Sequence, residues 1–249
     1  MARFWIGTSG WTYRDWKGRF YPKGLSARQW LSYYGQYFPT VEINSTFYRQ
    51  PRDETWDSWR SAAPEGFRFA VKAHRYLTHY RRLNDCEEPL DTVVKGARRL
   101  QEKLGPLLFQ MPPGFMRNDE SARRLEAFLD LLPPGLMAAF EFRDDSWFGE
   151  DTFRQLRRHS VAFCSYDMVG QECPLVTTAR FAYVRFHGSQ ALYGSRYTDE
   201  ELAAWGKRLA VLAAGLDEVY AYFNNDTLAF AVANAQQLSR LLSSPALTH

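Results

Sequence analysis

The chain carries a short apolar run about every 30 residues, and each run ends in polar or charged side chains. Eight such runs occur in its 249 residues, separated mostly by helix-length segments. This alternation favours one (β/α)8 barrel, in which the carboxyl ends of the strands meet at one mouth, where active sites lie. The eight run ends are Gly7–Trp11, Glu42–Tyr48, Val71–Arg75, Phe109–Pro113, Glu141–Trp147, Ser165–Asp167, Arg185–Gly188 and Phe223–Asp226.

We therefore predict an α/β fold with a single barrel domain over residues 1–249. The gap between the sixth and seventh strands leaves little room for a helix, so the barrel should be irregular, with a reduced sixth crossover. Helices are expected from about Asp53, Asn118, Thr152, Thr198 and Thr227. The predicted strands are Phe4–Thr8, Val41–Ser45, Phe69–Ala73, Leu107–Met111, Ala138–Arg143, Val161–Tyr166, Phe181–His187 and Val219–Asn224.

Bulk composition excludes several classes of protein. A net charge of +3 argues against a highly charged binding tail but allows a local basic site for phosphate or carboxylate. Three cysteines without a Cys-x-x-Cys pair indicate neither a disulfide framework nor a zinc knuckle. No apolar stretch is long enough to span a bilayer, and the first residues lead directly into a strand. We expect a cytoplasmic protein without membrane partners.

Alternation along the strands places charged residues inside the barrel. The apolar residues of each strand must face the helices, which leaves the polar set pointing inward. The interior holds two acidic side chains and three permanent cations, so about one positive charge is not neutralised. An anionic ligand would neutralise it. Alternatively, these residues form a closed salt-bridge layer that only fixes the register of the barrel. The set comprises Glu42, Lys72, Gln110, Glu141, Arg143 and Arg185, with Tyr222 below Asn224 and with His187 at the rim.

Acid–base chemistry is the mechanism that this set favours. Glu42 or Glu141 would act as a base and His187 as an acid or base. The three cations would clamp the anion, and Arg185 is the first candidate because its fork suits phosphate or carboxylate. The glutamates as a glycosidase-like pair and a Schiff base on Lys72 are alternatives. The predicted substrate-binding residues are Lys72, His74, Arg143, Arg185, Asn224 and Trp11.

A metal site is a weaker alternative. His74, His79 and His187 near strand ends could bind a divalent ion together with acidic residues. However, the histidines follow no common ligand spacing, and the interior cations would repel a metal. We therefore expect no metal and no cofactor.

Aromatic residues in the loops keep a second function open. Trp11, Tyr13 and Trp16 are interleaved with basic residues such as Arg14 and Lys17, as in surfaces that stack nucleobases. The alternative is that they pack the loops into a small satellite core. Asp226 after the last strand could likewise simply cap the final helix.

Seven stretches resemble the successive motifs of the YecE-like family, also known as domain of unknown function 72. The resemblance covers nearly the whole chain in order, and it implies a TIM-barrel-like fold without supplying an activity. The stretches are GTSGWTYRDWKGRFYP, VEINSTFYRQP, FAVKAHRYLTH, LGPLLFQMPP, FEFRDDSW, YVRFHG and YFNND.

We hypothesise an enzyme that acts on a small anionic substrate, phosphorylated or sugar-like, at the mouth of the barrel. An isomerase, lyase or hydrolase would fit the acid–base set. A nucleic-acid-binding or nucleic-acid-processing protein and a non-catalytic sensor or partner-binding domain are the alternatives. On the first hypothesis, Arg185→Ala should abolish anion binding without unfolding the chain. The sequence does not indicate an oligomeric state.

Overall fold

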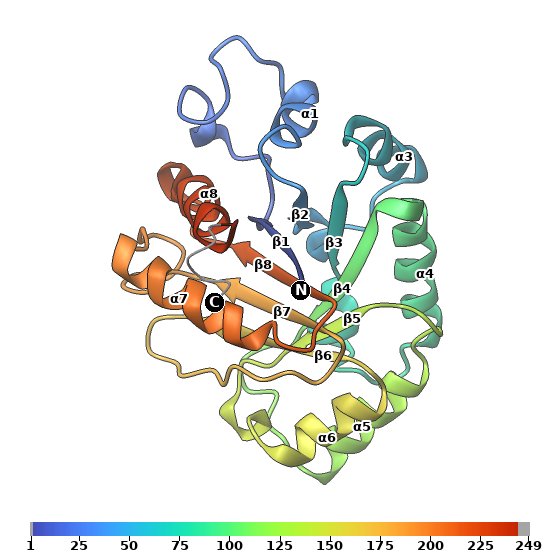
Figure 1. Cartoon of the computed structure of the whole chain (residues 1–249). Coiled ribbons are helices and arrows are strands. Elements are labelled where there is room, and N and C mark those ends of the chain that lie inside the picture. The colour runs from blue at the N-terminus through green and yellow to red at the C-terminus, as the bar shows by residue number, and fades with distance from the viewer. Residues whose placement is uncertain (1, 244–249) are drawn as a thin grey trace.

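The computed structural model describes residues 2–243 of the chain. Eight parallel strands form one sheet that curves into a nearly closed barrel, as predicted, with the order β1-β8-β7-β6-β5-β4-β3-β2 (Figure 1). The strands are β1 Arg3–Thr8, β2 Thr40–Ile43, β3 Arg68–Lys72, β4 Leu104–Gln110, β5 Ala138–Glu141, β6 Ala162–Asp167, β7 Phe181–Phe186 and β8 Glu218–Phe223.

The barrel closes between β1 and β2 at the mouth. Ser9 bridges to Glu42, and the amide of Gly10 donates to the Glu42 carbonyl at 2.8 Å. Close approach is possible because Gly7 has no side chain: a Cβ there would lie 2.2 Å from the Thr40 carbonyl oxygen. This closure brings the end of β1 next to the first acidic residue of the interior.

Helices cover the outside of the sheet, as Figure 1 shows. The expected helices near Asp53, Asn118, Thr152 and Thr198 are present, and Thr198 caps its helix through a capping box with Glu201. The helices are α1 Trp30–Tyr34, α2 Ser45–Tyr48, α3 Asp53–Ala62, α4 Glu87–Arg98, α5 Asp119–Asp130, α6 Glu150–Arg158, α7 Asp199–Leu212 and α8 Phe230–Ser243.

The reduced sixth crossover is confirmed, because residues 168–180 between β6 and β7 contain no helix. Differences lie at the mouth, where most strands end one or two residues earlier than predicted. The chain there turns into short elements instead: α2 after β2, a π-helix at Tyr76–Tyr80 after β3, and a 3-10 turn at Thr227–Ala229 after β8. The alternation of apolar and polar residues could not locate these strand ends, because contacts made by the loops determine where each strand ends.

The predicted separation of the two strand faces is also confirmed. The outward face joins the helices in one large apolar cluster that includes Val41, Ile43 and Phe140. The lower interior is filled by a second cluster rich in aromatic residues, in which Tyr183 stacks on Tyr220. The barrel is therefore packed below the mouth, and the fully buried charged groups Glu42, Glu141 and Arg185 lie in its upper interior. No helix within residues 2–243 is both long and apolar enough to cross a membrane.

Candidate functional site at the barrel mouth

A layer of paired charges fills the upper interior of the barrel. Arg185 on β7 is fully buried and donates from one nitrogen to Glu42 at 2.8 Å and from another to Glu141 at 2.7 Å. The two carboxylates, on β2 and β5, are also fully buried. Arg185 therefore holds opposite sides of the barrel together, and both ends of its fork are engaged by protein carboxylates.

Glu42 is satisfied by two further protein contacts. Its oxygens accept hydrogen bonds from the Ser9 hydroxyl and the Tyr183 hydroxyl, each at 2.7 Å, in addition to the pair with Arg185. Burial alone would raise the pKa of Glu42, but the Arg185 charge and these hydrogen bonds lower it below its usual value. Glu42 is therefore an ionised carboxylate at neutral pH with little free accepting capacity.

Glu141 continues the layer toward the rim. Its second oxygen accepts from Arg143, whose side chain is 8% exposed. Burial opposes ionisation, yet the charges of Arg143 and Arg185 hold the pKa of Glu141 well below its usual value. The two glutamates and two arginines thus balance each other, and the four residues form a neutral layer, called the salt-bridge layer below.

His187 connects this layer to the end of β8. Its Nε2 lies 3.1 Å from an Arg143 guanidinium nitrogen, and its Nδ1 lies 3.1 Å from the side-chain amide of Asn224. Burial, followed by the Arg185 charge, lowers the pKa of His187 to about 4, so the ring is neutral at pH 7. Arginine can only donate, so Nε2 of the neutral ring accepts from Arg143.

Lys72, at the end of β3, is the interior cation that the salt-bridge layer leaves out. None of the ion pairs within residues 2–243 includes Lys72, and its Nζ lies 4.3 Å from the centre of the Phe47 ring. Burial, followed by repulsion from Arg185, lowers the pKa of Lys72 to about 8 despite the opposing effect of the two glutamates. Lys72 is therefore mostly charged at pH 7 and has no carboxylate of its own.

More cations surround His79 on the π-helix. Its ring packs edge-on against Phe47, with centroids 4.9 Å apart. Burial, followed by the charges of Lys72, Arg75, Arg82 and Arg143, lowers the pKa of His79 to about 4. His74, predicted to bind substrate, accepts a hydrogen bond at Nδ1 from the amide of Tyr76 and lies partly exposed at the start of this loop. The side of the mouth formed by β3 is thus strongly cationic.

Asp226 lies on the opposite side of the mouth, after β8. Asp226 occupies the N-cap position of the turn Thr227–Ala229, but its side chain makes no capping hydrogen bond, so the alternative of a side-chain cap is not observed. Its Oδ1 is buried without a hydrogen-bond partner among the described residues. Burial raises the pKa of Asp226 to about 7, against the lowering effects of Tyr13 and Arg185. A carboxyl group that titrates near neutrality suits proton transfer.

The large aromatic residues after β1 pack into the main apolar cluster of the fold. Trp11 is only 6% exposed and meets Trp59 edge-on, so the structure places this predicted substrate-binding residue in the hydrophobic cluster. Trp16 and Tyr21 are buried as well. Tyr48 and Tyr80, which follow β2 and β3, are by contrast 65% and 62% exposed.

Sequence reasoning named all four residues of the salt-bridge layer and missed Tyr80; it considered His79 only as a metal ligand and Asp226 as a helix cap. Alternation locates inward residues on a strand, but these three lie in short turns beyond strand ends, where no period applies. As for a metal, residues 2–243 contain no group of three or more histidine, cysteine, aspartate or glutamate side chains that could hold an ion.

Comparison with known proteins identifies the family. The model of the family described as "Protein of unknown function DUF72" matches residues 5–248. A crystal structure of a DUF72 family protein from Thermotoga maritima has a TM-score of 0.89 and 31% identity, covering 97% of this chain and all (100%) of that one.

Curated relatives agree with this match. The UPF0759 protein YunF of Bacillus subtilis is 28% identical, over 96% of this chain and 94% of the relative. The UPF0759 protein YecE of Escherichia coli is 27% identical, over 83% and 80% respectively. The barrel, its order of motifs and these matches lead to one conclusion: the chain belongs to the DUF72 family, known in these relatives as UPF0759.

Proposed function

We propose that the chain is an enzyme that binds a small anionic substrate, phosphorylated or sugar-like, at the carboxyl-terminal mouth of the barrel. The observation that carries this proposal is Lys72, a charged side chain at the mouth beside a salt-bridge layer that is already neutral. A partly buried cation without a carboxylate costs stability, and a bound anion would relieve that cost. Lys72 replaces Arg185 as the first candidate for the anion.

Charges at the mouth support an anion rather than a cation as the ligand. Arg75, Arg82 and Arg143 act on the same region as Lys72, and the nearby glutamates are held by arginine. Arg143 is the one member of the salt-bridge layer with residual exposure, so it is the second candidate for a contact with the anion. Asn224, through His187, would orient that end of the layer.

Asp226 is the group best suited to carry a proton. In this proposal Glu42 and Glu141 stay ionised and hold Arg185 and Arg143 in place, and neutral His187 supports Arg143. Asp226, with its raised pKa and its free Oδ1, would donate or accept the proton of the reaction. An acid–base isomerase, lyase or hydrolase fits this division between anion binding and proton transfer.

Calorimetric titration with inorganic phosphate tests the anion site. Lys72→Met should weaken phosphate binding at least about tenfold, because a charge-assisted contact to an anion is lost in a partly desolvated site. Lys95→Met, which removes the same charge from the exposed face of α4, is the matched control and should bind as the parent does. Equal affinities in all three proteins would remove the basis of the proposal.

A further inference from the structure

Exposed tyrosines and an arginine gather beside the mouth on the loops after β2 and β3. The guanidinium carbon of Arg75 lies 5.8 Å from the centre of the Tyr48 ring and 5.5 Å from that of Tyr80. None of the ion pairs between residues 2 and 243 includes Arg75. Its planar cation is thus kept between two rings, a position that fixes its orientation without consuming its charge.

This group is continuous with the proposed anion site. The Tyr48 and Phe47 ring centroids are 5.1 Å apart, and Lys72 Nζ lies 4.3 Å from the Phe47 ring. Cations and aromatic rings therefore follow one another from the barrel interior to the surface, each step being shorter than 6 Å. We call this series the cation–aromatic ladder: Lys72, Phe47, Tyr48, Arg75 and Tyr80.

An unusual backbone holds the outer part of the ladder. Tyr80 ends a π-helix, a form that is rare and frequent at functional sites. Three residues shortly after it, Arg82, Leu83 and Asp85, have positive φ angles of 48°, 66° and 46°. Non-glycine residues in this region are strained, and such strain concentrates at ligand-binding and active sites. The backbone thus gives a second reason, independent of the side chains, to expect a ligand here.

We propose that the cation–aromatic ladder binds a nucleotide, with the base stacked on Tyr48 or Tyr80 and the phosphate between Arg75 and Lys72. Aromatic side chains stack nucleobases through their ring faces, and arginine and lysine meet phosphate. This inference rests on the proposed function, because it identifies the anion of that site as the phosphate of a nucleotide.

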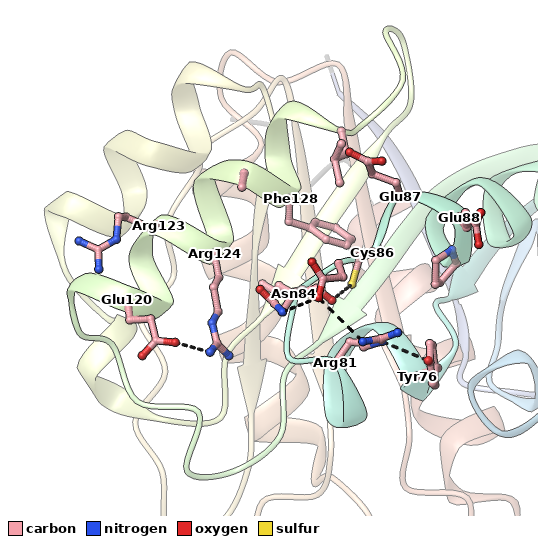
Figure 2. Close-up of a pocket in the computed structure, with 15 residues that line it drawn as sticks. Tyr76, Arg81, Asn84, Cys86, Glu87, Glu88, Glu120, Arg123, Arg124 and Phe128 are labelled. Atoms are coloured by element: carbon pink, nitrogen blue, oxygen red, sulfur yellow. Dashed lines mark hydrogen bonds and ion pairs between the residues drawn. The ribbon is translucent and has the colours of Figure 1, made fainter.

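The surface beyond the ladder favours a single nucleotide over a strand. The ring of Tyr76 lies 6.3 Å from that of Tyr80, centroid to centroid. Tyr76 also lines a groove of about 830 Å³ between the loop before α4 and helix α5 (Figure 2). Arg81–Asp85 and Arg124–Glu120 pair within it. The phosphates of a longer strand would meet more carboxylates than cations there. The charged lining residues are Arg81, Arg123 and Arg124 against Asp85, Glu87, Glu88 and Glu120.

Titrations of the full chain with adenosine 5′-monophosphate and ribose 5-phosphate test the ladder, since the two probes share a phosphate and differ in the base. Adenosine 5′-monophosphate should bind at least about fivefold more tightly, the lower bound for stacking one base. Exchanging both exposed rings, in Tyr48→Leu/Tyr80→Leu, should abolish this difference. Tyr37→Leu removes another exposed tyrosine, 48% exposed, that lies before β2 at the opposite end of the barrel, and should preserve it.

The outcomes separate the ladder from the anion site. Equal affinity for the two probes, or a base preference that persists in Tyr48→Leu/Tyr80→Leu, would overturn the proposal that the ladder binds a nucleotide. If phosphate binding still required Lys72, the proposed function would stand without it. A single-stranded oligonucleotide that binds more tightly than the mononucleotide would overturn the single-nucleotide assignment and favour a strand. The logarithm of its binding constant would then fall with the logarithm of the salt concentration by about 0.7 per phosphate contacted.

Discussion

Two charged regions at the mouth of the barrel differ in how their charges are matched. In the salt-bridge layer, Arg185 lies between two carboxylates and Arg143 completes the balance, all nearly free of solvent. On the cation–aromatic ladder, Lys72 and Arg75 face rings instead of carboxylates. Matched charges can hold a barrel together, whereas unmatched ones cost stability and are available to a ligand. We therefore assign the salt-bridge layer to the stability of the fold and the cation–aromatic ladder to the proposed ligand.

The largest effect is expected from the salt-bridge layer. Arg185→Met should destabilise the fold by about 3–5 kcal/mol, because it leaves two buried carboxylates without their shared cation. This revises the expectation from sequence that an Arg185 variant would lose binding and keep its fold. Urea unfolding measures the change, with Arg180→Met, which removes a solvent-exposed pair with Asp217, as the control that should change little. A native-like Arg185→Met would erase the distinction between the regions.

Asp226 should show the next largest effect, and its sign depends on pH. A pKa raised from 3.8 to about 7 means that its stabilising contribution is complete below pH 3.8 and is lost as pH rises through 7. Because the pKa is shifted by roughly three units, Asp226→Asn should raise the free energy of unfolding by up to about 4 kcal/mol at pH 8. The gain should vanish near pH 3. A constant difference between variant and parent over pH 3–8 would show that Asp226 titrates normally.

Lys72 should show a smaller gain in stability together with a loss of binding. Its pKa is lowered from 10.5 to about 8, so the folded protein is penalised where Lys72 is charged and recovers stability as pH rises from 8 to 10.5. Lys72→Met should therefore stabilise the fold at pH 7 by up to about 3 kcal/mol. Unfolding in urea at pH 7 and pH 10.5 measures this, and the gain should be smaller at the higher pH. If Lys72→Met were destabilised at both pH values, Lys72 would belong with the paired charges that stabilise the fold.

The smallest effect is expected at the outer end of the ladder. Tyr80 is 62% exposed, so Tyr80→Leu should change the free energy of unfolding by no more than about 0.5 kcal/mol. Thermal unfolding followed by circular dichroism is sufficient to test this. A loss above about 2 kcal/mol would mean that the ladder maintains the fold, and the contrast with Arg185 would disappear.

Sequence alone could predict the regular part of the molecule. Strand periodicity locates all eight strands and the inward direction of Glu42, Glu141 and Arg185, because alternation on a strand is a local property. It could not decide how the inward charges pair. That Arg185 is paired with two carboxylates while Lys72 lies over the Phe47 ring, without an ion pair among residues 2–243, depends on the curvature and closure of the barrel.

The structure of the turns at the mouth could not be predicted from the sequence for a different physical reason. A π-helix at Tyr76–Tyr80 and the buried position of Asp226 arise from contacts between loops that follow different strands. The aromatic residues after β1 illustrate the opposite outcome: their spacing allows both a stacking surface and a satellite core, and packing against Trp59 buries Trp11 in the core.

Titration of the Lys72 ammonium group by NMR, with and without inorganic phosphate, is the most direct measurement of the surplus charge at the mouth. The free protein should show a pKa of about 8, and saturating phosphate should raise it by at least about one unit, since an anion beside the group favours its charged form. A Lys72 that titrates near 10.5, or whose pKa phosphate leaves unchanged, would contradict the account.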